Sequence, residues 1–162
     1  TSTGHQAIAE TIQQMWKDTL GVNVKLVNQE FAVHLDSVKS RDTPQIYRLA
    51  WCLDYPDANN FAREQNAVNG NQNPADENGE PYGGFNGKNE EYERIVLEAA
   101  VETDPAKRVD LYAQAEQIAM VDDAIMIPIY WYTNLDLTKP YVQREYSVTG
   151  HEEYEKWDIL RH

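Results

Sequence analysis

The chain has 162 residues, of which 41 % are hydrophobic, so it is long enough to bury one sizeable core and predicts a single domain. Its 27 acidic and 14 basic residues give a formal net charge of -13, which disfavours binding to nucleic acids and anionic lipids. The one cysteine, Cys52, excludes an internal disulfide and a cysteine-based metal site. Residues 1–5 lack the basic and apolar stretches of a signal peptide, so we expect either a cytosolic protein or a piece of a longer chain.

The first third of the sequence alternates between helix and strand patterns. Residues 6–20 predict an amphipathic helix, and residues 31–40 predict a second one. Residues 22–27 alternate apolar and polar side chains, which indicates a half-buried strand, and residues 45–52 predict another strand. The predicted inward residues of the two helices are Ile8, Ile12, Met15, Trp16 and Leu20, then Phe31, Leu35 and Val38.

From residue 53 to 88 the periodicity stops, and Asn, Gly, Pro and Asp dominate, which predicts a long loop of the kind that carries function. Helical patterns return at residues 89–102 and 105–121, capped by Asn89 and Asp104 respectively. Their predicted inward residues are Tyr92, Ile95, Val96 and Ala99, then Val109, Tyr112, Ala115 and Ile118 or Ala119.

An apolar strand is expected at residues 125–132, at a sheet edge because it contains Pro128, followed by a short strand near Leu137. Helices that alternate with strands favour the α/β class, with a mixed sheet flanked by helices. Ligands in such sheets bind beyond the carboxyl ends of strands, so the segment just after Cys52 is the candidate site.

Five segments, in order along residues 5–146, carry a resemblance. Residues 48–57 (RLAWCLDYPD), with Phe61, look like an A-W-x-x-D-Y-x-D-P-x-x-F segment, and residues 84–92 resemble G-y-s-N-p-e-Y-D. Residues 98–117 resemble A-x-x-x-x-D-x-x-x-R-x-x-l-Y-x-x-A-E, and residues 127–132 (IPIYWY) and 139–142 (KPYV) resemble the apolar strand and turn that follow. These segments are typical of the peptide- and oligopeptide-binding components of ABC importers, the extracellular solute-binding proteins of family 5.

The resemblance implies one lobe of a type II periplasmic-binding-protein-like fold, spanning residues 1–162 of a longer two-lobed receptor. Residues 53–88 are expected to form a ligand-side loop, and residues 136–162 a tail that packs on the absent N-terminal lobe. It also implies a protein that is not an enzyme, needs no cofactor, binds a short peptide and delivers it to the importer's membrane permease. The expected location is extracellular or periplasmic, with or without a lipid anchor to the outer face of the membrane.

The resemblance also assigns roles to single residues. Asp54 is expected to pair with the ligand's α-ammonium, or else to cap a turn, and Arg48 to meet its carboxylate, or else to form a surface ion pair. Trp51 is expected to form a pocket wall or to be ordinary core. Cys52 contributes backbone groups beside the ligand, and its thiol matches a position that is disulfide-bonded in some members to an earlier cysteine. Tyr55 completes the expected ligand-binding set.

Departures from the family pattern leave the solute open. The chain has Asp57-Ala58 where the family usually has Asp-Pro, Glu93 where it has Asp, and an apparent insertion at residues 66–81. A sugar, a nickel complex or haem is the alternative ligand within the same family.

A hydrolase using Asp54 and Asp57 as an acid pair is a second hypothesis, although the sequence contains no G-x-S-x-G or H-E-x-x-H motif. A structural interaction domain is the third.

Overall fold

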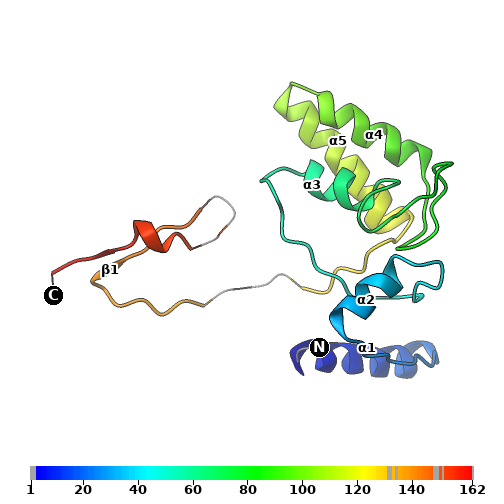
Figure 1. Cartoon of the computed structure of the whole chain (residues 1–162), viewed down its shortest axis with the longest axis horizontal. Helices are drawn as coiled ribbons and strands as arrows, with labels where there is room; N and C mark the ends of the chain where they lie inside the picture. Colours follow the sequence, from blue (N-terminus) through cyan, green and yellow to red (C-terminus); the bar gives the residue numbers. More distant parts are fainter. Residues whose placement is uncertain (1–2, 131–132, 134, 148–149, 151, 162) are drawn as a thin grey trace.

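The computed structural model describes residues 3–130, 133, 135–147, 150 and 152–161. They form a helical body from which the C-terminal part of the chain extends as a long arm (Figure 1). The body contains α1 (Thr3–Leu20), α2 (Phe31–Val38), α3 (Asn59–Phe61), α4 (Glu90–Val101) and α5 (Pro105–Gln117), and π-helical turns η1 (Ala62–Asn66) and η2 (Ile118–Asp122) continue α3 and α5. The arm carries β1 (Val142–Gln143), the 3-10 turn η3 (Tyr154–Lys156) and β2 (Asp158–Ile159).

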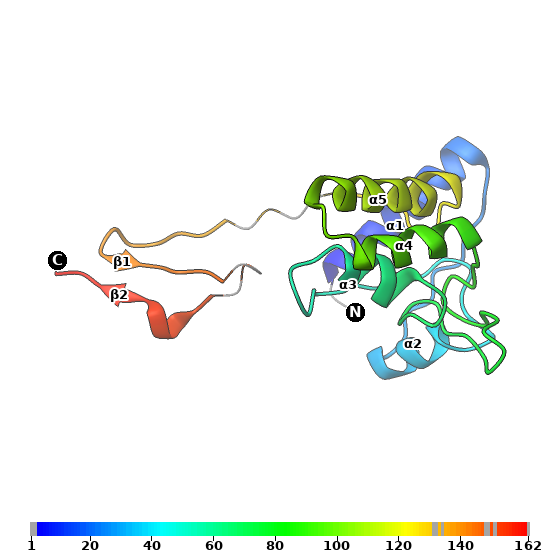
Figure 2. The ribbon, with the colours of Figure 1, turned by 90° about the horizontal axis from the view of Figure 1, so that it is seen from above.

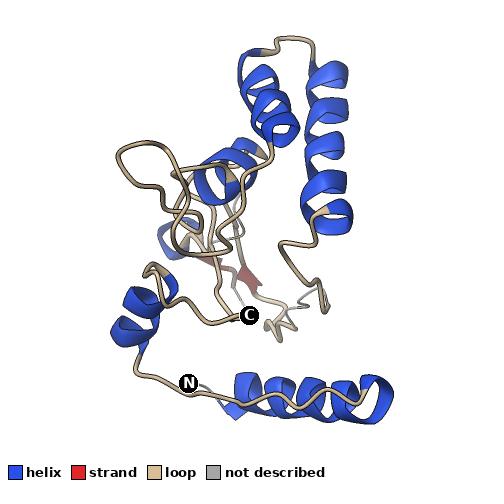
Figure 3. Ribbon diagram, turned by 90° about the vertical axis from the view of Figure 1, so that its right-hand side faces the viewer, coloured by secondary structure: helices blue, strands red, loops and turns tan. Residues whose placement is uncertain are grey.

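The core lies where α4 and α5 pack side by side against η1 (Figure 3). The predicted inward face of α4 is confirmed, because all four of its residues are buried. Ala115 and Ala119 bury against this face from α5 and η2, and Ala67 closes the cluster from the segment after η1. The helical period of the sequence therefore located the main core correctly.

Helix ends follow the predicted chemistry. The side chain of Asn89 accepts hydrogen bonds from the backbone N–H groups of Glu91 and Tyr92, and Asp104 accepts from Ala106 and Lys107. Each side chain satisfies backbone donors that have no partner within their own helix. At α2 the cap is Glu30, which the sequence analysis did not identify.

The predicted burial of α1, and of one residue in each of two other helices, is wrong. No residue of α1 is buried, and Met15 and Leu20 are 59 % and 65 % exposed. Phe31 in α2 and Val109 in α5 are exposed as well. These side chains are apolar, but no neighbouring element covers them within the described residues, and an apolar side chain is buried only where a neighbour covers it.

The predicted mixed sheet is absent from the described residues, whose only sheet is the antiparallel pair of β1 and β2, with Val142 opposite Ile159. Residues 22–27 and 45–52 form no β-ladder, nor do residues 125–130 of the third predicted strand, whose last two residues lie outside the described ones. The strand expected near Leu137 is replaced by β1, a few residues later. Strands exist only when a neighbour takes up their backbone N–H and C=O groups, and a single segment's alternation says nothing about that neighbour.

Residues 53–88 contain structure that the loop prediction missed, because α3 and η1 occupy residues 59–66. The rest is held by backbone hydrogen bonds, including one from Gly84 N to the carbonyl oxygen of Val38 at 2.7 Å. Gly84 has φ +63°, and a Cβ there would lie 1.8 Å from the Gln72 carbonyl oxygen. This long segment is therefore packed against α2 and against η1, where Asn71 N and Gln72 N donate to the carbonyl oxygens of Glu64 and Gln65.

The C-terminal arm runs away from the helices and folds back on itself near its end (Figure 2). The Arg144 guanidinium lies over the rings of Tyr146 and Trp157, at 5.0 and 4.7 Å from their centroids, and pairs with Glu152. Along the arm Leu135 and Leu137 are fully exposed. None of the described helices is both long enough and apolar enough to cross a bilayer.

Candidate functional site

The candidate segment, residues 48–57, lies between α2 and α3: residues 48–53 have no regular secondary structure, and residues 54–57 bend toward the start of α3. It contains all five residues that the sequence analysis assigned to ligand binding. Of these, Arg48, Cys52, Asp54 and Tyr55 are exposed, and Trp51 is half-buried. The structure thus brings the five residues to the surface on one short segment, next to the first turn of α3.

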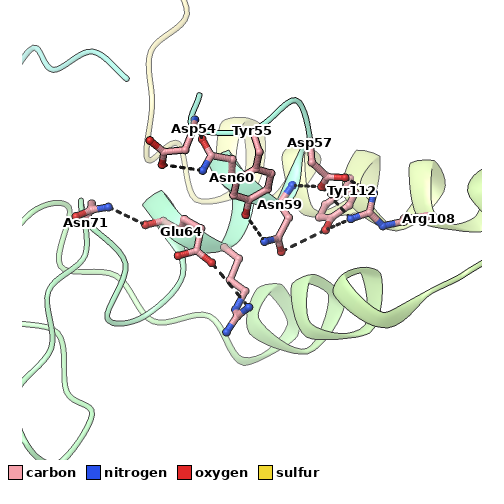
Figure 4. A network of polar contacts seen from close by, with 10 residues as sticks. Asp54, Tyr55, Asp57, Asn59, Asn60, Glu64, Asn71, Arg108 and Tyr112 are labelled. Carbon is pink, nitrogen blue, oxygen red and sulfur yellow. Dashed lines mark hydrogen bonds and ion pairs between the residues drawn. The ribbon is translucent and has the colours of Figure 1, made fainter. Parts of the chain in front are cut away.

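Asn60 in α3 connects two of these residues through its fully buried side chain. Its Oδ1 accepts hydrogen bonds from the indole Nε1 of Trp51 at 2.8 Å and from the backbone N of Asp54 at 3.1 Å. Its Nδ2 donates to Oδ2 of Asp54 at 3.2 Å. Figure 4 shows the amide of Asn60 beside the Asp54 carboxylate. One side chain therefore contacts both the acid and the aromatic residue of the expected site.

Asp54 keeps its carboxylate at the surface, with one oxygen in contact with Asn60. Asn60 is neutral, so it orients the carboxylate without cancelling its charge. Within the described part of the chain no cation pairs with Asp54. Asn60 thus positions the Asp54 carboxylate, whose second oxygen has no partner among the described residues.

Arg48 is fixed through its backbone, while its guanidinium reaches solvent. The carbonyl oxygen of Arg48 lies 2.9 Å from Nε2 of His34 in α2, and because a carbonyl only accepts, Nε2 is the donor in this contact. Within the described residues the Arg48 side chain forms no ion pair, so the alternative of a surface ion pair is not what the structure contains.

Tyr55 and Cys52 complete the segment. The Tyr55 hydroxyl accepts a hydrogen bond from Nδ2 of Asn59 at 2.7 Å. Cys52 is a free and exposed thiol. No group of three or more His, Cys, Asp or Glu side chains in the described residues is arranged to hold a metal ion.

Asp57, the other member of the hypothetical acid pair, is tied to α5. Its two carboxylate oxygens accept from the guanidinium of Arg108 at 2.7 and 2.8 Å, and Oδ1 also accepts from the backbone N of Asn59 at 2.8 Å. The hydrogen bonds from Arg108 hold the pKa of the Asp57 carboxyl below its usual range. Because the Arg108 guanidinium occupies both oxygens of this carboxylate, Asp57 is not free to act as the acid or the base of a catalytic pair, so this geometry disfavours the acid-pair hydrolase.

Arg108 extends the network further. Its Nε donates to the carbonyl oxygen of Ala99 in α4 at 3.0 Å, and one of its terminal nitrogens donates to the hydroxyl of Tyr112 at 3.2 Å. Tyr112 lies 3.4 Å from the side-chain oxygen of Asn59, and its burial raises the pKa of the phenol. Figure 4 follows this chain of contacts from Tyr55 to Arg108. The candidate segment is thereby fastened to the α4 and α5 pair.

Asn60 and the Asp57–Arg108 pair were not predicted from the sequence, although Asp57, Arg108 and Tyr112 lie within the motifs of the resemblance. The Y-x-D of the first motif and the R-x-x-l-Y of the helix-pair motif meet in space. An Arg and a Tyr four residues apart on one helix face were the available signal. Nothing in the sequence indicated which acid they contact.

Two concavities lie away from this segment. One, of about 350 Å³, lies between η1, the turn after it and α4, and is lined by Arg63, Val68 and Leu97 among others. The other, of about 490 Å³, is lined by Asn66, Phe85, Lys88 and Asp123 among others. Neither is lined by the half-buried Trp51 or the exposed Asp54.

Comparisons with known proteins agree on the class of this chain. Residues 1–73 match the family model described as bacterial extracellular solute-binding proteins, family 5 Middle. The periplasmic oligopeptide-binding protein OppA of Escherichia coli K12 is 36 % identical over 142 residues, which are 88 % of this chain and 24 % of that protein. The oligopeptide-binding protein OppA of Bacillus subtilis 168 is 36 % identical over 134 residues, 83 % of this chain and 22 % of that protein. The periplasmic murein peptide-binding protein MppA of E. coli K12 is 32 % identical over 148 residues, covering 88 % of this chain and 24 % of MppA.

The matched segment, residues 1–73, belongs to the extracellular solute-binding proteins of family 5, and most of the chain is similar to the oligopeptide-binding relatives. The chain spans about a quarter of the length of these relatives. The family implies a periplasmic-binding-protein-like fold, and the described residues are a helix-rich portion with a two-stranded sheet.

Proposed function

We propose that this chain is part of the solute-binding component of an ABC importer, and that it binds short peptides by pairing their α-ammonium with Asp54. The observation that carries the proposal is the Asp54 carboxylate, which is exposed, unneutralised and hydrogen-bonded on one oxygen by Asn60 next to Trp51. A charge-assisted hydrogen bond of this kind stabilises a complex by roughly 1.5 to 3 kcal/mol. The relatives named for oligopeptides and murein peptides support the ligand class.

The other residues of the segment have complementary roles in this proposal. The exposed Arg48 guanidinium meets the ligand's carboxylate, for which its planar fork is suited. The Trp51 indole forms a wall that accepts varied side chains through contact area. Backbone groups around Cys52 pair with the extended ligand irrespective of its sequence, and Tyr55 flanks the same face.

A second lobe closes the site in the proposed receptor. Asp54 is exposed and Trp51 is half-buried, and a peptide beside them becomes well buried only when a facing surface covers it. The N-terminal lobe of the same polypeptide would supply that surface, and residues 136–162 would pack on it. The receptor would act outside the cytoplasmic membrane, in the periplasm or lipid-anchored on the cell surface, and pass its ligand to the membrane permease.

Calorimetric titration of the full-length receptor that contains this chain tests the proposal. Trialanine should bind, N-acetyl-trialanine should bind at least about tenfold more weakly, and Asp54→Asn should weaken the binding of trialanine most. Sugars, nickel complexes and haem belong in the same panel, because they are the alternative ligands of this family. Binding of one of these without any binding of peptides would overturn the proposal.

A further inference from the structure

We infer that Asn60 is a positioning residue for the ligand's ammonium: its buried amide sets the orientation of the Asp54 carboxylate relative to the Trp51 indole. This inference rests on the proposed function, because it assigns the geometry of that same site. Asn60 does not face the ligand itself, since its side chain is fully buried. It acts through the two residues that it contacts.

The contacts determine which way the amide points. Trp51 Nε1 and the Asp54 backbone N are donors only, so the atom that faces both, at 2.8 and 3.1 Å, must be the amide oxygen. The amide nitrogen then faces Oδ2 of Asp54, which accepts at 3.2 Å. Three mutually consistent hydrogen bonds leave one orientation of the side chain.

That orientation places both site residues under one constraint. Asp54 is exposed, and without Asn60 its carboxylate would rotate among several rotamers. The bond to Oδ2 restricts this rotation and leaves Oδ1 without a partner among the described residues. The bond to Trp51 fixes the ring on the same amide, so the acid and the aromatic wall keep a constant relative position.

The contrast with Asp57 shows why a neutral partner matters. Two hydrogen bonds from the Arg108 guanidinium neutralise the Asp57 carboxylate, which is thereby committed to holding the fold. Asn60 orients Asp54 without adding a positive charge, so the negative charge that attracts an ammonium is retained. The same short segment thus holds one acid for structure and presents one for binding.

Asn60→Ala in the full-length receptor tests the inference, with trialanine and N-acetyl-trialanine as probes. The measured quantity is the ratio of their affinities, because a general loss of stability lowers both affinities together. Asn73→Ala is the matched control: Asn73 is also fully buried, lies in the same segment of the chain and donates only to the backbone oxygens of Asn66 and Gly87. Should Asn60→Ala fail to fold, Asn60→Ser, which keeps one oxygen, carries the same comparison.

Asn60→Ala is expected to lower the preference for the free amine about tenfold, the scale of one charge-assisted hydrogen bond, while Asn73→Ala leaves it unchanged. In an Asp54→Asn background, Asn60→Ala should have no further effect on the ratio, because it acts through that carboxylate. An unchanged ratio in Asn60→Ala, with a wild-type receptor that does discriminate, would overturn the inference alone. A wild-type receptor that binds both probes equally would instead refute the proposed pairing with Asp54.

Discussion

Asp57 and Arg108 form a bidentate ion pair across 51 residues of sequence, with N–O distances of 2.7 and 2.8 Å. The pair joins the end of the candidate segment to α5, and through the Ala99 carbonyl oxygen it also contacts α4. Both side chains are a little under a third exposed, so water screens the pair less than an ordinary surface contact. Its position makes it the main polar connection between the site and the helical core.

Removal of the guanidinium should therefore destabilise the fold. Arg108→Ala leaves Asp57 and the Ala99 carbonyl oxygen without their partner, and we expect the free energy of unfolding to fall by about 2 to 3 kcal/mol. Urea denaturation measures this change. Arg94→Ala is the control, because Arg94 is also an ion-paired arginine, with Glu91 and Glu98 as its partners, but is well exposed on α4, and its loss should cost much less. Equal losses in the two variants would contradict the structural role of Arg108.

The same pair should make stability depend on pH in the acid range. The Asp57 carboxyl has a lower pKa in the folded protein than its ordinary value of 3.8, chiefly through the hydrogen bonds from Arg108. Its contribution is therefore complete above that value and disappears as pH falls through the lower folded pKa. Asp57→Asn should be less stable than the wild type at pH 7, and this gap should narrow below about pH 4. Denaturation midpoints at pH 7, 5 and 3 give the comparison, and a gap that is constant with pH would refute it.

Two glycines allow the effect of backbone conformation on stability to be measured separately from the effect of close packing. Gly84 and Gly79 have φ of +63° and +76°, but a Cβ on Gly84 would lie 1.8 Å from the Gln72 carbonyl oxygen, whereas one on Gly79 meets nothing within 4 Å. Gly79→Ala should cost about 1 to 2 kcal/mol, the penalty of a left-handed alanine alone. Gly84→Ala should cost clearly more, because the backbone of residues 72 and 84 must also separate. Thermal unfolding measures the loss of stability in each variant. Equal losses would contradict the close approach of residue 84 to the Gln72 carbonyl oxygen.

Tyr92 provides a test of the core. Its ring is 5 % exposed, and its hydroxyl donates to the Ala62 carbonyl oxygen at 2.7 Å. Tyr92→Phe should lower the free energy of unfolding by about 1 kcal/mol, since it leaves that oxygen without this donor. Burial also raises the pKa of the Tyr92 phenol well above its ordinary value. The folded wild type should therefore ionise the same number of tyrosines as folded Tyr92→Phe up to about pH 11, although it contains one more. Spectrophotometric titration of the two proteins counts the tyrosines that ionise. Tyr82→Phe, at a half-buried ring without a described hydroxyl partner, is the control.

Local features of the fold were predictable because they depend on neighbours within one or two turns. The spacing of Tyr92, Ile95, Val96 and Ala99 identified the buried face of α4, and the polar residues at positions 89 and 104 identified two helix starts. The surface position of the predicted binding residues was also predictable, since a loop that follows an apolar segment tends to lie at the surface.

The longer-range features were not predictable, for a physical reason. Residues 22–27 and 45–52 carry the alternation of strands, yet a ladder depends on a partner that no single segment specifies. In the same way Phe31 has the right position on its helix to be buried but nothing covers it within the described residues. The contact of Asp57 with Arg108 joins two motifs that each looked complete alone.

The cation between the two rings at the end of the arm has a consequence for how that arm meets other surfaces. The described partners of Arg144, which include Asp136, Thr138, Tyr146 and Trp157, all lie within 13 residues of it. The arrangement of these side chains around Arg144 therefore depends on contacts within the arm and not on the helical body. Any surface that receives this arm meets a shape that already exists, and the conformational entropy of those side chains is lost before the encounter instead of during it.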